Sequence, residues 1–191
     1  MPDIEIRFDD DGIEFLRYPY PPSSVYPSGK IAYASIIEID ADAAPPEIRT
    51  EREILFISAT MKEELRRAAS ANAIPAVRRI DVWGLLLEPF LDTEFDREDK
   101  ERTLRLLEES GILRDESVEI RRSVTRAMEA YNFDSMLWDW CHLGLADVLD
   151  AFRGVLSGPR HRLPPDEYEA FYWRAMEIAR KGKIIGYEKA T

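Results

Sequence analysis

The sequence predicts an α+β fold: a small antiparallel β-sheet with a closing helix, followed by a mostly antiparallel helical region. Over the first third of the chain apolar and polar residues alternate, which is the period of a half-buried strand. From Asp81 onward apolar residues recur every three or four positions, as on one face of a helix. The pattern changes between Asn72 and Asp81. We therefore expect a strand-rich N-terminal domain at 1–74 and a helical C-terminal domain at 75–191, two parts that can also pack as one unit.

The chain opens with a predicted β-hairpin. Residues 4–8 alternate Ile, Ile and Phe with charged side chains, and residues 13–15 resume the alternation. Between them, residues 9–12 supply three aspartates that tolerate turn geometry and a glycine that can adopt positive φ. Residues 18–27 then contain four prolines, which cannot donate a backbone hydrogen bond to a sheet. This segment is predicted to be a loop.

Three more strands are predicted before the first helix. Residues 31–39 form a strand with one irregular step at Ser35, which indicates a bulge or an edge shift. Residues 47–50 and 54–57 are two shorter strands. The connection between these two is short enough for a second hairpin.

A helix over 61–72 is predicted to close the sheet. Thr60 precedes Glu63 by three positions, the spacing of a capping box in which each side chain satisfies a backbone donor of the other residue. Antiparallel strands followed by one amphipathic helix, together with the strand at 30–39, resemble a bacterial pleckstrin-homology-like domain over residues 4–73. The family has seven strands and five are predicted here. The first turn is acidic where phosphoinositide-binding members have a basic loop, so the resemblance implies a fold and no lipid ligand.

The helical part is predicted to contain five helices. They lie at about 81–91, 103–109, 115–131, 134–152 and 166–181. Asp81 and Asp134 are placed to accept hydrogen bonds from the first turns of their helices, and Pro89 is expected to kink or end the first one. Residues 156–165 are rich in proline and glycine and predict a loop. The apolar stripes of the last two helices are expected to pack on each other or to support a homodimer.

The composition excludes several classes of function. The formal charge is -11, from 37 acidic and 26 basic residues, and such a surface repels the phosphates of nucleic acid. Residues 1–11 lack the apolar run of a signal peptide, and no apolar run approaches the roughly 20 residues that span a bilayer. One cysteine, Cys141, excludes an intrachain disulfide and favours a reducing compartment. We expect a cytoplasmic protein that binds neither nucleic acid nor membranes.

The candidate catalytic residues are Asp139 and His142. In the predicted fourth helix they are three positions apart, so a carboxylate and an imidazole would project from neighbouring surface. The alternative is a half-buried histidine that bonds to Asp139 or to the backbone. Zinc ordinarily takes three or four protein ligands, and His161, the other histidine, has Gly158 rather than a carboxylate three positions before it. No metal is predicted.

No cofactor is predicted either. The sequence contains no phosphate-binding loop, dinucleotide fingerprint, zinc-protease motif or hydrolase elbow. Two acidic runs, which begin at Asp40 and Asp92, fail the calcium-loop pattern because Pro45 and Arg97 stand where glycine must turn the chain. Cys141 lies in the apolar stripe of its predicted helix and is expected to behave as a small core residue.

The candidate partner-binding residues are Tyr18, Tyr20 and Tyr26. They alternate with prolines in a semi-rigid loop, and large amphipathic rings of this kind often anchor protein interfaces. The alternative is that the rings fold back over the sheet or the helices.

These observations favour a non-enzymatic, cytosolic regulatory or interaction protein with a protein partner. An inhibitor or an immunity-type protein that covers a basic partner would fit the acidic charge. The alternative function is a small-molecule or metal-dependent helical-bundle enzyme that uses Asp139 and His142.

Overall fold

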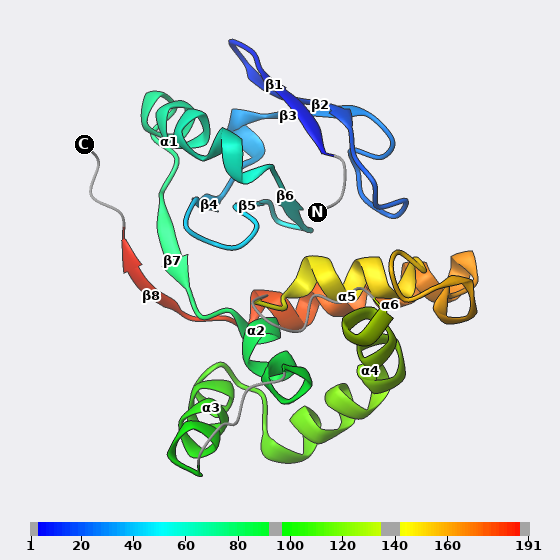
Figure 1. Cartoon of the computed structure of the whole chain (residues 1–191). Coiled ribbons are helices and arrows are strands. Elements are labelled where there is room, and N and C mark those ends of the chain that lie inside the picture. The colour runs from blue at the N-terminus through cyan, green and yellow to red at the C-terminus, as the bar shows by residue number, and fades with distance from the viewer. Residues whose placement is uncertain (1–3, 92–96, 135–141, 188–191) are drawn as a thin grey trace. The chain divides into compact units, whose positions relative to one another are not determined.

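The structure is a computed structural model that describes residues 4–91, 97–134 and 142–187 (Figure 1). The chain divides into two compact units, one formed by residues 1–79 with 184–191 and the other by residues 80–183. The strands of the described residues form small antiparallel sheets in the first unit, and the second unit is helical. The predicted α+β class is confirmed.

The first sheet has the strand order β1-β2-β3. Its strands are β1 (Glu5–Phe8), β2 (Gly12–Arg17) and β3 (Gly29–Ala32). The predicted hairpin is confirmed, because Phe8 pairs with Ile13 and Arg7 with Glu14. Gly12 begins β2 where β3 comes very close: a Cβ at this position would collide with the carbonyl oxygen of Ile31. The close approach therefore requires glycine.

A second three-stranded sheet has the order β4-β5-β6. Its strands are β4 (Glu38–Asp40), β5 (Glu47–Arg49) and β6 (Ile54–Phe56), which confirms the second hairpin. The predicted single strand at 31–39 is wrong. A 3-10 helix at Tyr33–Ser35 separates β3 from β4, because Tyr33 N–H bonds the carbonyl of Asp11 and Ile36 N–H bonds the carbonyl of Tyr33. The chain thereby leaves one sheet and enters the other.

Helix α1 (Lys62–Ala71) confirms the predicted closing helix, but the predicted capping box is wrong. A 3-10 helix at Ala59–Met61 precedes α1, and Ser58 Oγ accepts the hydrogen bond from Thr60 N–H. Two strands that were not predicted complete the first unit: β7 (Val77–Arg79) and β8 (Ile184–Tyr187), which pair antiparallel although they are distant in sequence.

Buried charges connect three strands of the first unit. Arg79 Nε and Nη2 donate to the two carboxylate oxygens of Glu38, at 2.5 and 3.0 Å. Arg49 Nη2 donates to Glu47 at 2.7 Å, and its Nε lies 3.8 Å from Glu38. The side chains of Glu38 and Arg49 are 7% and 10% exposed. Because an isolated buried charge is costly, these pairs hold β4, β5 and β7 in one arrangement.

The second unit is built from five helices within its described residues. They are α2 (Val82–Leu87), α3 (Arg97–Glu109), α4 (Arg114–Asp134), α5 (Leu145–Phe152) and α6 (Pro165–Arg180). Pro89 lies in a 3-10 helix at Glu88–Phe90, so α2 ends before it as predicted. Trp83 of α2 is buried and donates Nε1–H to the carbonyl of Ala175 in α6, at 3.0 Å. None of the helices in the described part of the chain combines the length and apolar character that crossing a membrane requires.

The predicted helix at 134–152 is confirmed over α5 (Leu145–Phe152), and it is wrong at its start and at residues 142–144. Asp134 is the last residue of α4 rather than the cap of a new helix, and His142 to Gly144 are not helical. Gly144 has an extended backbone and caps α5: its N–H bonds Asp147 Oδ2 at 2.8 Å. The apolar face of α6 packs on α5 inside the second unit, where Phe171 contacts Phe152, so this face is covered by its own chain.

Candidate functional site

The three predicted partner-binding tyrosines occupy different environments. Tyr18 and Tyr20 are buried in the first unit, where their rings contact each other edge to face. Phe15 and Phe56 extend this row of rings, and the hydroxyl of Tyr18 accepts a hydrogen bond from Phe56 N–H. Tyr26 is 44% exposed. Tyr18 and Tyr20 therefore stabilise the core, and Tyr26 remains the member of this set that a partner could contact.

The structure describes one of the two candidate catalytic residues, His142. Asp139 lies outside the described residues. His142 lies just before α5 and is not on a helix. Its Nε2 is 2.7 Å from Oδ2 of Asp81, 61 residues earlier in the chain. The carboxylate partner of His142 is thus Asp81, which the sequence predicted as a helix cap and not as a site residue.

Asp81 joins two structural elements through one carboxylate. Its Oδ1 accepts the N–H of Gly84 at 2.9 Å, which caps α2, and its Oδ2 contacts the imidazole of His142. The hydrogen bond with Asp81 raises the pKa of His142; burial opposes this rise, and the negative charges of Asp81, Asp147 and Glu88 add to it. Both side chains are about half exposed. The pair can exchange a proton with solvent, and it also ties the start of α2 to the segment before α5.

Asp147 is the second carboxylate beside His142. It accepts hydrogen bonds from the N–H of Gly144 and from the hydroxyl of Tyr131, the latter at 2.9 Å. Burial raises the pKa of Asp147, while these two bonds oppose the rise. Within the described part of the chain, no group of three or more His, Cys, Asp or Glu side chains could hold a metal ion.

Gly84→Ala is expected to break the contact between Asp81 and His142. A Cβ at this position would lie 2.8 Å from both Asp81 Oδ2 and His142 Cε1. The pKa of His142 should therefore fall toward 6.5 in an NMR titration of the imidazole Cε1–H resonances. A histidine with a raised folded-state pKa stabilises the fold below its unfolded pKa, and this stability is lost as the pH rises through the folded pKa.

The wild-type protein should accordingly lose about 0.5 kcal/mol relative to Gly84→Ala as the pH rises from about 6 to about 9, a size typical of partly exposed ion pairs. Urea unfolding at the two pH values measures this difference, and His161→Gln assigns the second histidine resonance. An unchanged pKa of His142 in Gly84→Ala would contradict the expected coupling to Asp81.

A cavity of about 320 Å³ lies between α3, the first half of α4 and the 3-10 helix after α2. Helical spacing places its lining residues on two facing stripes, with Lys100, Thr103 and Leu104 on α3 and Arg114, Ser117, Val118 and Arg121 on α4. Glu88 and Pro89 complete the lining. The described lining residues therefore include three cationic side chains and one carboxylate.

The polar groups inside the cavity are held in place by the protein. The hydroxyl of Thr103 donates to Glu88 Oε2. Arg121 Nε and Nη2 donate to the carbonyls of Leu86 and Leu85, at 3.0 and 3.1 Å, so the guanidinium caps the last turn of α2. Burial lowers the pKa of Arg121, and the negative charge of Glu88 opposes this effect. The guanidinium and the carboxylate thus keep defined positions at the cavity.

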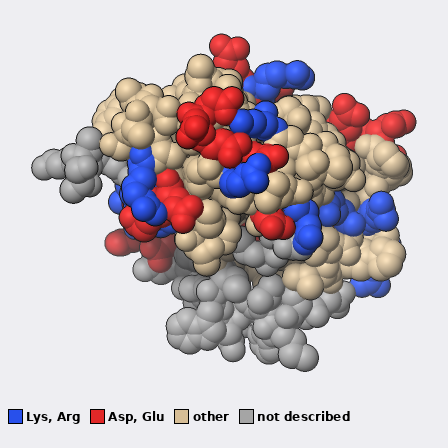
Figure 2. All heavy atoms as spheres, turned by 90° about the horizontal axis from the view of Figure 1, so that it is seen from above, with Lys and Arg blue, Asp and Glu red and all other residues tan. Residues whose placement is uncertain are grey.

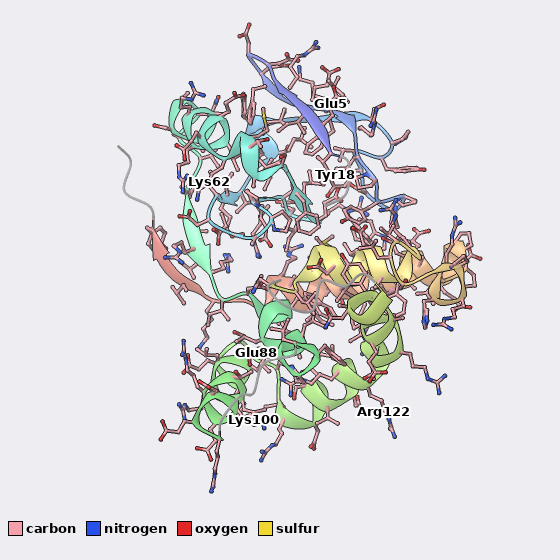
Figure 3. The ribbon with its side chains drawn as sticks, viewed as in Figure 1. Glu5, Tyr18, Lys62, Glu88, Lys100 and Arg122 are labelled. Carbon is pink, nitrogen blue, oxygen red and sulfur yellow. The ribbon has the colours of Figure 1, made fainter. Side chains whose placement is uncertain are left out.

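Two exposed cations stand at the same cavity. No carboxylate of the described residues lies within ion-pair distance of Lys100 or Arg114. Lys100 of α3 and Glu88 both line this cavity, whereas Figure 3 shows Arg122 projecting from the outer side of α4. The lining of this cavity therefore holds more cations than carboxylates, in a protein whose formal charge is -11.

On the face that Figure 2 draws, the acidic residues do not form one continuous patch. Figure 2 shows acidic and basic side chains interspersed over the visible face. In the first turn, Lys30 lies 3.1 Å from Asp9 and 2.5 Å from Asp11, and Arg7 lies 2.5 Å from Glu14. Asp9 and Asp11 of this turn therefore pair with neighbouring cations.

The residues of the cavity were not predicted as a site. Arg114 and Arg121 are seven positions apart, with Val118 between them, and this spacing of cations on one helix face was the available signal. It identifies a stripe, but it does not indicate which other stripe faces it. No family model, curated protein or solved structure matches this chain, so the resemblance of residues 4–73 to pleckstrin-homology-like domains stays a prediction.

Proposed function

We propose that this chain is a non-enzymatic regulatory protein whose second unit binds a small organic anion with an apolar body. The observation that carries the proposal is the cavity of about 320 Å³, which is lined by Lys100, Arg114 and Arg121 together with Glu88. This volume is within the range of small-molecule sites, which combine apolar walls with a few placed polar groups.

The charge of the cavity supports an anionic ligand. Glu88 already accepts a hydrogen bond from Thr103, and Arg121 already donates to two backbone carbonyls. Lys100 and Arg114 would pair with a carboxylate, sulfonate or phosphate at the opening. Charge-assisted hydrogen bonds of this kind are stronger than those between neutral groups.

The walls support an apolar body for the same ligand. Pro89, Leu104 and Val118 line the cavity, and Val118 is 57% exposed in the structure. Leu113, the residue immediately before α4, is 68% exposed. Covering apolar surface contributes roughly 25 cal/mol per Å² of area removed from water. A medium-chain carboxylate satisfies both the charge and the walls.

Binding can be tested with 8-anilinonaphthalene-1-sulfonate, a fluorescent aromatic anion, and with octanoate as its competitor. We expect octanoate to displace the probe and octan-1-ol, which has the same chain without the charge, to displace it at least about tenfold less well, since tenfold corresponds to about 1.4 kcal/mol. Equal displacement by the acid and the alcohol would contradict the proposal.

The double variant Lys100→Gln/Arg114→Gln is expected to bind octanoate about tenfold more weakly in isothermal titration, because each exposed charge pair contributes up to about 1 kcal/mol. Arg122→Gln removes one charge from the outer side of the same helix and should bind octanoate as the wild type does. If the double variant kept wild-type affinity, the cavity would not be the binding site.

A protein partner is a second part of this proposal. It is supported by the formal charge of -11 and by the exposed ring of Tyr26. A basic partner, as an inhibitor or immunity-type protein would have, is the class that such a charge attracts. Raising the salt concentration should weaken this association, because salt screens exposed charges.

An acid–base enzyme centred on His142 is the second candidate function. It is favoured by the 2.7 Å contact between His142 and Asp81, a pair that is about half exposed to solvent. In this enzyme, Asp81 would orient the imidazole of His142, which is the role that the sequence predicted for Asp139. The test is whether turnover of any substrate found in an activity screen is lost in His142→Ala and reduced in Asp81→Asn.

A further inference from the structure

Strand β8 lies at the edge of a two-stranded sheet in the first unit. It pairs antiparallel with β7, and β7 is joined on its other side to β4, where Ile39 N–H bonds the carbonyl of Pro75 at 2.9 Å and Ile39 bridges to Ala76. No described strand pairs with the outer edge of β8. Backbone N–H and C=O groups on such an edge can pair with a further strand.

The side chains of β8 are unusually exposed for their type. Ile185 is 63% exposed and Tyr187 is 74% exposed, more than any other large apolar side chain described in the first unit. Residues Ile184–Tyr187 contain no charged residue and no proline, which are the usual means by which proteins protect an edge strand. A register irregularity at Arg78 and Arg79 interrupts the pairing with β7 near Ile184, while the pairing at Gly186 and Tyr187 is regular.

The sequence of β8 is self-complementary in one antiparallel register. If Gly186 of one chain lies opposite Gly186 of a second, Ile185 of each chain lies opposite Tyr187 of the other. Pairs of a β-branched and an aromatic side chain are among the favourable cross-strand pairs. A two-fold axis at Gly186 brings the strands together at a residue without a side chain, and nothing described lies within 4 Å of a Cβ placed there.

We propose that the outer edge of β8 binds a second copy of this chain, in the antiparallel register centred on Gly186. The two-fold axis makes the contact isologous, so each pair of side chains occurs twice. The proposal is independent of the cavity in the second unit, since it uses residues of the first unit alone. We therefore still propose a homodimer, but through β8 rather than through the faces of the last two helices, which the sequence predicted as its interface.

The dimer is expected to be weak and to depend on salt. A contact through residues 185–187 of each strand buries less than the roughly 1,600 Å² of a standard interface, so a dissociation constant of about 100 μM is expected. Each chain carries a formal charge of -11, and like charges oppose association. Added salt should therefore strengthen the dimer, in contrast to its effect on a basic partner.

Sedimentation equilibrium of the full chain, from micromolar to millimolar concentration, tests the proposal. The wild type should show a monomer–dimer equilibrium. Ile185→Lys and Tyr187→Glu, each alone, should weaken the dimer at least about tenfold, because each places a charge opposite an apolar side chain. Ile37→Lys, which changes another exposed apolar residue of the first unit away from β8, should dimerise as the wild type does.

Mixing the two variants tests the register itself. In an equimolar mixture of Ile185→Lys and Tyr187→Glu, the introduced ammonium lies opposite the introduced carboxylate, and the other cross-strand pair is the native Ile185 and Tyr187. The mixture should therefore form a heterodimer more tightly than either variant forms a homodimer. The proposal is overturned if the wild type stays monomeric throughout, or if the mixture associates no better than the separate variants.

Discussion

Replacing Trp83 by alanine is expected to lower the free energy of unfolding of the second unit by about 3 to 5 kcal/mol, as for other buried aromatic residues. Trp83 is 1% exposed, and its indole N–H bonds the carbonyl of Ala175 at 3.0 Å. The substitution removes the contacts between α2 and α6 and leaves that carbonyl without its indole donor. Native domains are stable by only about 5 to 15 kcal/mol, so this substitution would remove a large fraction of the free energy of unfolding.

Urea unfolding followed by far-UV circular dichroism measures this loss. Trp83→Phe keeps most of the ring and removes the hydrogen bond, so it should cost less than Trp83→Ala. Trp173→Ala is the matched control, because Trp173 is on α6 but is only partly buried. Should Trp83→Ala cost no more than Trp173→Ala, the packing of α2 on α6 would not be a main source of stability.

Glu38→Ala is expected to destabilise the first unit by about 3 to 5 kcal/mol, as when one member of a buried ion pair is removed. Arg79 donates two hydrogen bonds to Glu38, whose side chain is 7% exposed. Alanine cannot accept these bonds, and the partly buried guanidinium of Arg79 must then be rehydrated or moved. The junction between β4 and β7 should open first.

Hydrogen exchange locates this effect, since the amides of β4, β5 and β7 should lose protection before those of β1 and β2. Arg67→Ala is the control: Arg67 is 3.9 Å from Glu64 and both side chains are exposed, so its removal should change stability by less than about 0.5 kcal/mol. Uniform loss of protection throughout both sheets would argue against a local role for Glu38.

Sequence patterns correctly predicted the secondary-structure elements that depend only on residues close together in the chain. Alternation at 4–8 and 13–15, with three aspartates and a glycine between them, was sufficient for the first hairpin. Pro89 correctly marked the end of α2, and Asp81 correctly marked its cap. Each of these features depends on steric limits or hydrogen bonds within a few residues. They could therefore be predicted without knowledge of the rest of the fold.

Other features depend on partners that are distant in sequence. β7 and β8 are three and four residues long, too short to give a pattern, and each exists as a strand through pairing with the other. The strand predicted at 31–39 is interrupted because the backbone of Tyr33 bonds the carbonyl of Asp11, which belongs to the first turn. The apolar stripe that continued past Asp134 did not reveal the cap at Gly144.

The sequence by itself determined the class of fold, the first hairpin and the positions of most helices, because propensities, caps and turns act over short distances. Only the tertiary structure decided the candidate sites. It placed Asp81 beside His142 across 61 residues, buried Tyr18 and Tyr20, and brought cations of α3 and α4 to the same cavity as Glu88. The periodicity of a helix or a strand shows which side chains lie on the same face. Which other residues contact that face depends on how distant segments of the chain pack together.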